Sequence, residues 1–231
     1  MRREITVVCI IALALLAPAC TVGSGEVVTE TRPVEGFEGI DLRGMGEVII
    51  TVDGTESLTI EAEDNIIDDL TSEVRSGTLI LGTDRPIRPT EDIIFTVTMQ
   101  ALEAIEISGS GAITVGEFST SDFEMDVSGS GAANVSDIVS DTVFARISGS
   151  GAISISGDAD ELDLSISGSG AFDGERLEAD TGDVNISGSG SATVNVSEDL
   201  EANISGSGNV EYLGNPNVSV DSSGSGNVSR R

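Results

Sequence analysis

The sequence predicts an all-β fold, a parallel β-helix (solenoid) with about 18–20 residues per coil and Ser-Gly-Ser-Gly corners. The first observation behind this prediction is a motif that reads ISGSGA at residues 107–112 and returns six more times with small changes. Its successive copies are 20, 20, 19, 20, 18 and 18 residues apart. A fixed period near 20 residues is typical of a solenoid, in which each repeat forms one coil.

The second observation is the period inside each repeat. Around the first copy, Ile105, Ile107, Ile113 and Val115 are apolar at every second position, and the two glycines between them keep the same phase. Period two is the strand period, with one set of side chains pointing inward. Strands stacked coil upon coil at a spacing of about 4.8 Å form a parallel β-helix.

The glycines of the motif are the predicted structural corners. We expect both glycines of each motif to face inward where the coil bends, because a side chain there would collide with the next coil. We expect the serines, such as Ser108 and Ser110, to point outward and to bond backbone groups through their hydroxyls. The predicted corner residues are Gly109, Gly111, Gly129, Gly131, Gly149, Gly151, Gly168, Gly170, Gly188, Gly190, Gly206, Gly208, Gly224 and Gly226.

The N-terminal half contains a diverged copy of the motif at residues 40–50, with apolar residues or glycine in the same phase. Further strand-like segments lie at residues 58–62, 77–81 and 93–99. Between the first two, residues 64–70 fit one helical turn capped by Asp64. No break in composition divides this region, so we predict a single β-helix domain over residues 33–231.

Residues 1–19 have the composition of a signal peptide. Arg2 and Arg3 precede an apolar stretch that is too short to span a bilayer comfortably. The Ala19–Cys20 junction resembles the lipobox of bacterial lipoproteins, in which the cysteine is lipidated and becomes the first mature residue. The alternative is an ordinary secretory peptide cleaved after Ala19. We expect residues 20–32 to provide the lipidated Cys20 and a tether, and the protein to be anchored to a membrane of the bacterial cell envelope.

Charge and composition exclude several functions. The formal net charge of −29 disfavours binding to nucleic acid and to anionic lipid headgroups. The absence of histidine excludes a Ser-His-Asp triad and, with Cys20 as the one mature cysteine, disfavours a zinc site. We therefore predict no catalytic residue, metal site or cofactor. Acidic residues close together in the sequence, which we interpret as solvated loop charges, are Asp68, Asp69, Asp158, Asp160, Glu161 and Asp163.

Small polar residues are predicted to form a flat outward strip beside the corners. Its first row is Ala112, Ala132, Ala152, Ala171, Ser191, Asn209 and Asn227, and its second row is Thr114, Asn134, Ser154, Asp173, Thr193, Glu211 and Ser229. The strip could present a regular surface to a polymer, a partner or ice, or it could simply be economical packing at a corner. On the other side of the motif, Arg146 is expected to stack beside Asp126.

The order of VEGFEGIDLRGMGEVIITVDG, LTIEAEDNIIDDL, SGTLIL and the serial SGSG motifs resembles the bacterial head GIN domain family. The resemblance covers nearly the whole mature chain. It implies a right-handed β-helix, a role in adhesion as an auto-transporter adhesin, and often a lipoprotein signal. No catalytic residues of that family carry over to this sequence.

Residues and resemblance together predict a non-enzymatic, lipid-anchored protein of the cell envelope that acts as an adhesin or scaffold. The alternatives are a carbohydrate-binding or polysaccharide-acting β-helix protein and, less favoured, an ice-binding protein. The expected partners are the membrane, through the lipid, and a glycan or cell-surface protein. Arg230 and Arg231 at the last coil would repel each other across an end-to-end contact, so a monomer or weak oligomer is expected.

Overall fold

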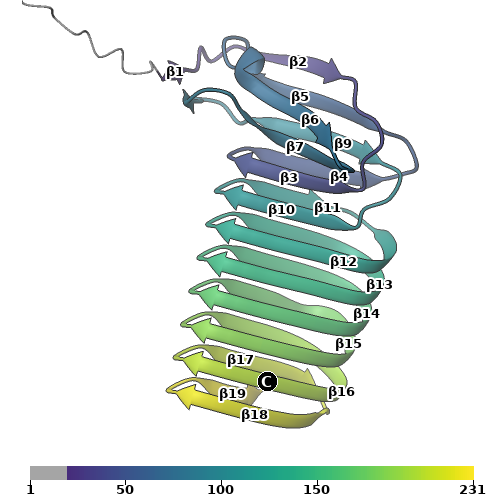
Figure 1. The fold of residues 1–231 in the computed structure, drawn as a ribbon, viewed down its shortest axis with the longest axis vertical. Coiled ribbons are helices and arrows are strands. Elements are labelled where there is room, and N and C mark those ends of the chain that lie inside the picture. Colours follow the sequence, from purple (N-terminus) through teal and green to yellow (C-terminus); the bar gives the residue numbers. More distant parts are fainter. Residues whose placement is uncertain (1–19) are drawn as a thin grey trace, which may run out of the picture.

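The computed structural model describes residues 20–231, which form a flattened β-solenoid with an N-terminal cap (Figure 1). The predicted signal peptide, residues 1–19, lies outside the described residues. Each coil of the solenoid has a leading side, which runs into the Ser-Gly-Ser-Gly turn, and a trailing side, which leaves it. We call this turn the glycine corner and the bend at the other edge of the coil the open bend.

The coils are built from strands that pair in parallel with the coils before and after them. These strands are β10 (Ala104–Gly109), β11 (Ala112–Val115), β12 (Phe118–Gly129), β13 (Ala132–Gly149), β14 (Ala152–Gly168), β15 (Ala171–Gly188), β16 (Ser191–Gly206), β17 (Asn209–Gly214), β18 (Asn217–Gly224) and β19 (Asn227–Arg230). Equivalent residues of successive motifs lie opposite each other, as in the series Ile107, Val127 and Ile147. The predicted all-β parallel solenoid is therefore confirmed.

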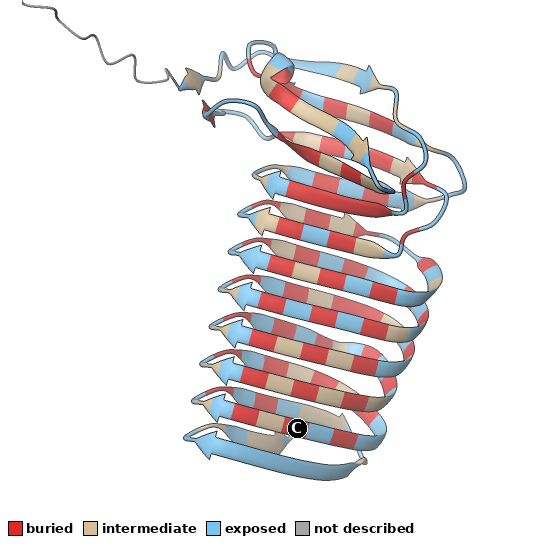
Figure 2. Ribbon diagram, viewed as in Figure 1, coloured by how far each residue is buried: buried red, intermediate tan, exposed pale blue. Residues whose placement is uncertain are grey.

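Alternation decides which side chains form the core. On β13, Val143, Ala145 and Ile147 are buried, whereas the residues between them are exposed. The same striping runs along the coils in Figure 2, up to β18 in the last coil, which is exposed along its whole length. The core is aliphatic with a few phenylalanines, as a chain without tryptophan requires.

The two glycines of a corner have different roles, which corrects the prediction that both face inward. Gly149, a first glycine, is half-buried and has φ of +122°, and a Cβ added to it would lie 2.6 Å from the carbonyl oxygen of Gly129 in the preceding coil. Gly151, a second glycine, is buried, and its Cβ would lie 2.5 Å from the Val127 side chain. The first glycine allows the turn, and the second leaves room for the core of the neighbouring coil.

Backbone groups hold the corners together, in contrast to the predicted role of the serine hydroxyls. The Ser150 N–H donates to the carbonyl of Gly129 at 2.8 Å, and the Ala152 N–H donates to Gly131 at 3.0 Å. The same pair of bonds recurs at the following corners. Within residues 20–231, no motif serine hydroxyl makes a hydrogen bond to another protein group, and the carbonyls of the adjacent coil accept from backbone N–H groups instead.

The cap mixes parallel and antiparallel pairing, and this differs from the predicted uniform solenoid over residues 33–231. Its strands are β1 (Thr21–Val22), β2 (Val27–Arg32), β3 (Gly39–Gly44), β4 (Glu47–Val52), β5 (Ser57–Glu63), β6 (Leu70–Arg75), β7 (Thr78–Thr83), β8 (Ile87–Arg88) and β9 (Ile94–Met99), with the short 3-10 helix η1 (Ile67–Asp69). Strands β3 and β4 are the predicted diverged coil and pair in parallel with β10 and β11. Strands β2 and β5, β5 and β9, and β6 and β7 pair antiparallel. The tight Ser76–Gly77 turn, where both residues have positive φ, reverses the chain between β6 and β7.

The segment predicted to be a tether, residues 20–32, is part of the cap. Strand β1 pairs with β8 and β2 pairs with β5. The buried carboxylate of Glu63 accepts hydrogen bonds from the Gly25 N–H and from the N–H and hydroxyl of Thr90, so it joins this segment to a neighbouring loop. The hydroxyl of Thr90 contributes most to lowering the pKa of Glu63 below its usual value.

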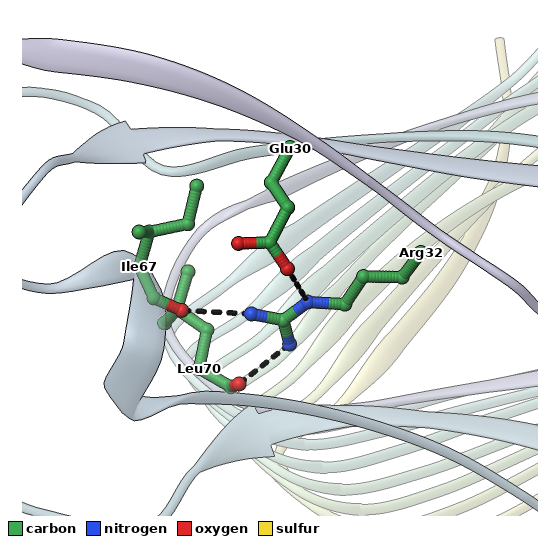
Figure 3. Close-up of polar contacts among 4 residues, drawn as sticks. All are labelled: Glu30, Arg32, Ile67 and Leu70. Carbon is green, nitrogen blue, oxygen red and sulfur yellow. Dashed lines mark hydrogen bonds and ion pairs between the residues drawn. The ribbon is translucent and has the colours of Figure 1, made fainter.

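Arg32 fixes the end of β2 to the short helix. Its guanidinium donates to the carbonyl oxygens of Ile67 at 2.8 Å and Leu70 at 2.6 Å, and it pairs with Glu30 at 2.7 Å (Figure 3). The Ile67 carbonyl oxygen also accepts a bond from the Leu70 N–H, so Arg32 adds a second donor there and supplies a donor for the Leu70 carbonyl, which lies just past the helix. The helix itself begins after Ile66 without a side-chain cap, so the expected capping by Asp64 is wrong. The Asp64 carboxylate instead accepts a bond from the Ser24 hydroxyl.

The corner geometry predicts that a glycine at a corner and a glycine outside the corners differ greatly in how far mutation to alanine destabilises the fold. Gly149→Ala is expected to lower the free energy of unfolding by about 2–4 kcal/mol, from a strained backbone and a clash with the preceding coil. The matched control is Gly116→Ala, because a Cβ there would meet no atom within 4 Å; its effect should stay within about 0.5 kcal/mol. Ser148→Ala should cost less than about 1 kcal/mol. Denaturant unfolding of the three variants measures this, and equal losses at Gly149 and Gly116 would contradict the assignment.

Candidate functional site

The leading side carries one long outward column of polar residues. In register from the cap to the last coil it contains Asp41, Glu106, Asp126, Arg146, Ser165, Asn185, Asn203 and Asp221. Arg146 lies 3.6 Å from the Asp126 carboxylate and 3.7 Å from that of Glu124, so the predicted stacking of Arg146 beside Asp126 is confirmed. Farther along, the amide of Asn203 donates to the amide oxygen of Asn185 at 3.2 Å.

The trailing side carries the predicted strip of small polar residues. Residues Ala112, Ala132, Ala152, Ala171, Ser191, Asn209 and Asn227 lie opposite one another on successive coils, as do Thr114, Asn134, Ser154, Asp173, Thr193, Glu211 and Ser229. All of them are exposed or half-buried. The strip is therefore a surface ordered at the spacing of the coils, although Asp173 and Glu211 interrupt its uncharged character.

The open bend is hollowed where the strands turn from the trailing to the leading side. A hollow of about 1060 Å³ runs across several coils there. Its acidic lining residues are Asp141, Asp158, Asp160, Glu178 and Asp180, and the other lining residues are mostly serine, threonine, asparagine and alanine. Of the predicted acidic groups, Asp158 and Asp160 thus line this hollow. Glu161 and Asp163 lie farther along β14 on its outward face, and Asp68 and Asp69 belong to η1.

Carboxylates stacked in register repel each other on the leading side. Asp183 lies between Asp163 and Glu201. Partial burial and then these two neighbours raise the pKa of Asp183 above its usual value. The Asn185 amide, which donates to Asp183 at 2.8 Å, offsets this only in part.

A second raised pKa occurs where the leading column meets the cap. Burial and the carboxylates of Asp41 and Asp126 raise the pKa of Glu106. Asp41 is buried; one of its carboxylate oxygens binds the Arg43 guanidinium at 2.6 Å, whereas the other has no hydrogen-bond partner. Glu106 is therefore flanked by a carboxylate on each neighbouring coil.

Other kinds of site are not found among the described residues. Over residues 20–231, no three cysteine, aspartate or glutamate side chains are grouped so that they could hold a metal ion. In the same range, no helix is long and apolar enough to cross a membrane. Cys20, the predicted lipidation site, is an exposed free cysteine that directly precedes the first strand of the cap.

The fold is thus a capped solenoid whose in-register columns lie on the outside of the coils. The family described as "Putative auto-transporter adhesin, head GIN domain" matches residues 36–216. This chain belongs to that family, as its serial SGSG motifs indicate. A search of curated proteins gave no match.

Solved structures share the fold along nearly the whole chain. A putative adhesin from Bacteroides fragilis superposes with a TM-score of 0.86 at 25% identity, covering 91% of this chain and 99% of that one. A putative lipid binding protein from Parabacteroides distasonis gives 0.77 at 23% identity, covering 92% and 100%. A putative adhesin from the same species gives 0.74 at 22% identity, covering 92% and 100%.

Two surface features have no counterpart in the sequence predictions, namely the hollow at the open bend and the exposed ring of Phe144. The hollow depends on how the coil curves, which residue types alone do not specify. Phe144 could have been found, because it falls between the inward residues Val143 and Ala145 and is therefore out of phase with the core.

Relieving carboxylate repulsion should stabilise the protein. Asp183→Asn is expected to raise the Tm near neutral pH by about 1–3 °C. Because the pKa of Asp183 is raised by folding, its charge lowers stability above the folded pKa, and this cost is relieved as the pH falls through that pKa. The gain should therefore shrink toward about pH 4. Thermal melting across this range, with the exposed Asp221→Asn as control, measures the effect; a gain independent of pH would contradict it.

Proposed function

We propose that this protein is a non-enzymatic, lipid-anchored adhesin of the bacterial cell envelope that holds a surface partner on the outside of its solenoid. The observation that carries the proposal is that Cys20 is exposed and directly precedes β1, which lies at the cap and away from the free end of the solenoid (Figure 1). A lipid on Cys20 would hold the cap at the membrane and leave the coils to extend away from it.

The packing of residues 21–32 supports this orientation. Because β1 and β2 are paired within the cap, only a short stretch of backbone would separate the lipid from the folded domain. From the Gly44 corner to the Gly224 corner there are seven coil steps, which at about 4.8 Å each give a length of about 34 Å. The sides and bends of these coils would stay accessible to a partner.

The outward rows support a binding role over a catalytic one. Their residues are small or polar and repeat at the spacing of the coils, which suits contact with an extended partner at several points at once. The membership of the head GIN domain family and the adhesin names of two structurally similar proteins point the same way.

Anchoring is tested by the fate of Cys20. Cells producing the full chain and fed an alkyne-tagged fatty acid should label it and retain it in the detergent phase of a phase separation. Cys20→Ser should abolish the label and move the protein to the aqueous phase. Val22→Ser, at an exposed position two residues away, is the matched control and should keep the label. An unlabelled wild-type chain in the aqueous phase would overturn the anchoring proposal.

Adhesion is tested with the lipidated chain in liposomes. Such liposomes should be retained on at least one of three surfaces, coated with mucin, collagen or peptidoglycan, well above liposomes without protein. Retention should fall as free wild-type chain is added, because the sites on the surface become occupied. Retention no better than that of bare liposomes on all three surfaces would count against the adhesin proposal.

A further inference from the structure

A notch lies where the regular coils begin, below the cap. Strand β12 pairs with β10 only from Glu124 onward, opposite Ala104. The earlier residues of β12 have no strand on the cap side, because the chain enters β10 from the cap through Glu103, whose carbonyl accepts a bond from the Glu124 N–H at 2.9 Å. The resulting hollow of about 470 Å³ is lined by Glu103, Ala104, Thr120, Ser121, Asp122, Glu124 and Phe144.

Phe144 is the exposed aromatic residue of this notch. Its relative exposure is 42%, whereas the other five phenylalanines of the chain are at most 8% exposed. A single exposed apolar side chain is ordinary, but this one lines a hollow. A ring at an outward position on β13 adds nothing to the core, so its contribution is to the surface.

Polar groups surround the ring. Phe144 lies in register between Glu124 and Asp163 on the neighbouring coils. Arg146, two residues along the same strand, reaches the Glu124 carboxylate at 3.7 Å while its side chain stays 60% exposed. The notch thus combines one aromatic face, carboxylate acceptors and hydroxyls, and the Arg146 guanidinium lies beside its lining residue Glu124.

We propose that the notch binds a neutral oligosaccharide, with the C–H face of one sugar ring on Phe144. The weakly positive C–H groups suit the negative face of the aromatic ring. The sugar hydroxyls donate to the Asp122 and Glu124 carboxylates, and Arg146 donates to sugar oxygens; charged partners make such bonds the stronger ones. The inference rests on the proposed adhesin function and names the chemistry of the partner.

Size and charge define the ligand further. A hollow of about 470 Å³ lies within the usual range of about 300–1,000 Å³ for small-ligand sites. Thr120 and Ser121 also line the larger hollow of the open bend, so a longer glycan could continue around the bend. The net charge of −29 and the carboxylates of the notch repel acidic sugars.

A protein partner fits the notch less well. Protein interfaces centre on several apolar or aromatic side chains from which water is excluded. In the notch, Phe144 and the small Ala104 are the apolar lining residues, and the remainder are acidic or hydroxylated.

Ligand-observed NMR on the full chain in detergent micelles tests the proposal. The probes are maltotetraose, cellotetraose and mannotetraose, with trigalacturonate as the acidic comparison. At least one neutral probe should bind, and trigalacturonate should bind at least tenfold more weakly. Phe144→Ala should weaken the neutral probe about tenfold or more, whereas Phe144→Tyr, which keeps a ring, should stay within about threefold. Glu124→Gln should weaken it severalfold.

The matched control is Val220→Ala, which trims an exposed apolar residue on β18 and should leave affinity unchanged. Equal Tm values for wild type and variants exclude a folding effect. The proposal is overturned if no neutral probe binds the wild type, if Phe144→Ala binds as well as wild type, or if trigalacturonate binds equally.

The liposome assay separates this inference from the proposed function. Loss of retention with Phe144→Ala and after periodate treatment of the surface supports a glycan at the notch. Loss with Phe144→Ala that protease treatment reproduces, while periodate has no effect, identifies a protein partner and overturns the glycan. Full retention by Phe144→Ala liposomes overturns the notch as the adhesive site but leaves the adhesin proposal standing, whereas no retention of wild type defeats the adhesin proposal itself.

Discussion

The contact between stacked glycine corners is the constraint on which the structure depends. At each corner the backbone of one coil lies so close to the carbonyl of the previous one that a methyl group would not fit. Glycine therefore lies over glycine, and the pairing of every other residue in the coil follows from that fixed point. The contacts within the outward columns are consequences of this register. Some are favourable ion pairs, as between Arg146 and Asp126, and others are repulsive pairs of carboxylates, as between Asp163 and Asp183.

The cap covers the N-terminal edge of the solenoid. A solenoid has an edge of unpaired backbone groups at each end, and such edges invite pairing with other chains. At the N-terminal end, antiparallel strands pair around the diverged coil of β3 and β4, and Arg32 and Glu63 fasten the segment that follows Cys20. The chain must leave this irregular cap to enter the regular coils, and the notch beside Phe144 forms where it does so.

The solenoid could be predicted from the sequence, but several details of its structure could not. Serial SGSG motifs and period-two alternation were sufficient to predict parallel coils, the inward residues and the partner of Arg146. Alternation of apolar and polar residues is the same in parallel and antiparallel strands. The strands near residues 58–62 and 93–99 could therefore be predicted, but their antiparallel pairing could not. Alternation also does not specify φ, which distinguishes Gly149 from Gly151. Residues 21–32 lack a clear period and join the cap through contacts with distant side chains such as Glu63.

The identical corners also bear on how such a chain can change in evolution. Duplication or loss of the DNA for one whole coil would leave each glycine stacked on another glycine, so the fold would survive in a taller or shorter form. Insertion of one or two residues within a coil would instead move the following corner off its neighbour, unless a bulge such as that between Val135 and Ile138 absorbed the change. Selection could thus adjust how far the solenoid extends in units of whole coils while leaving the first coils and their notch untouched.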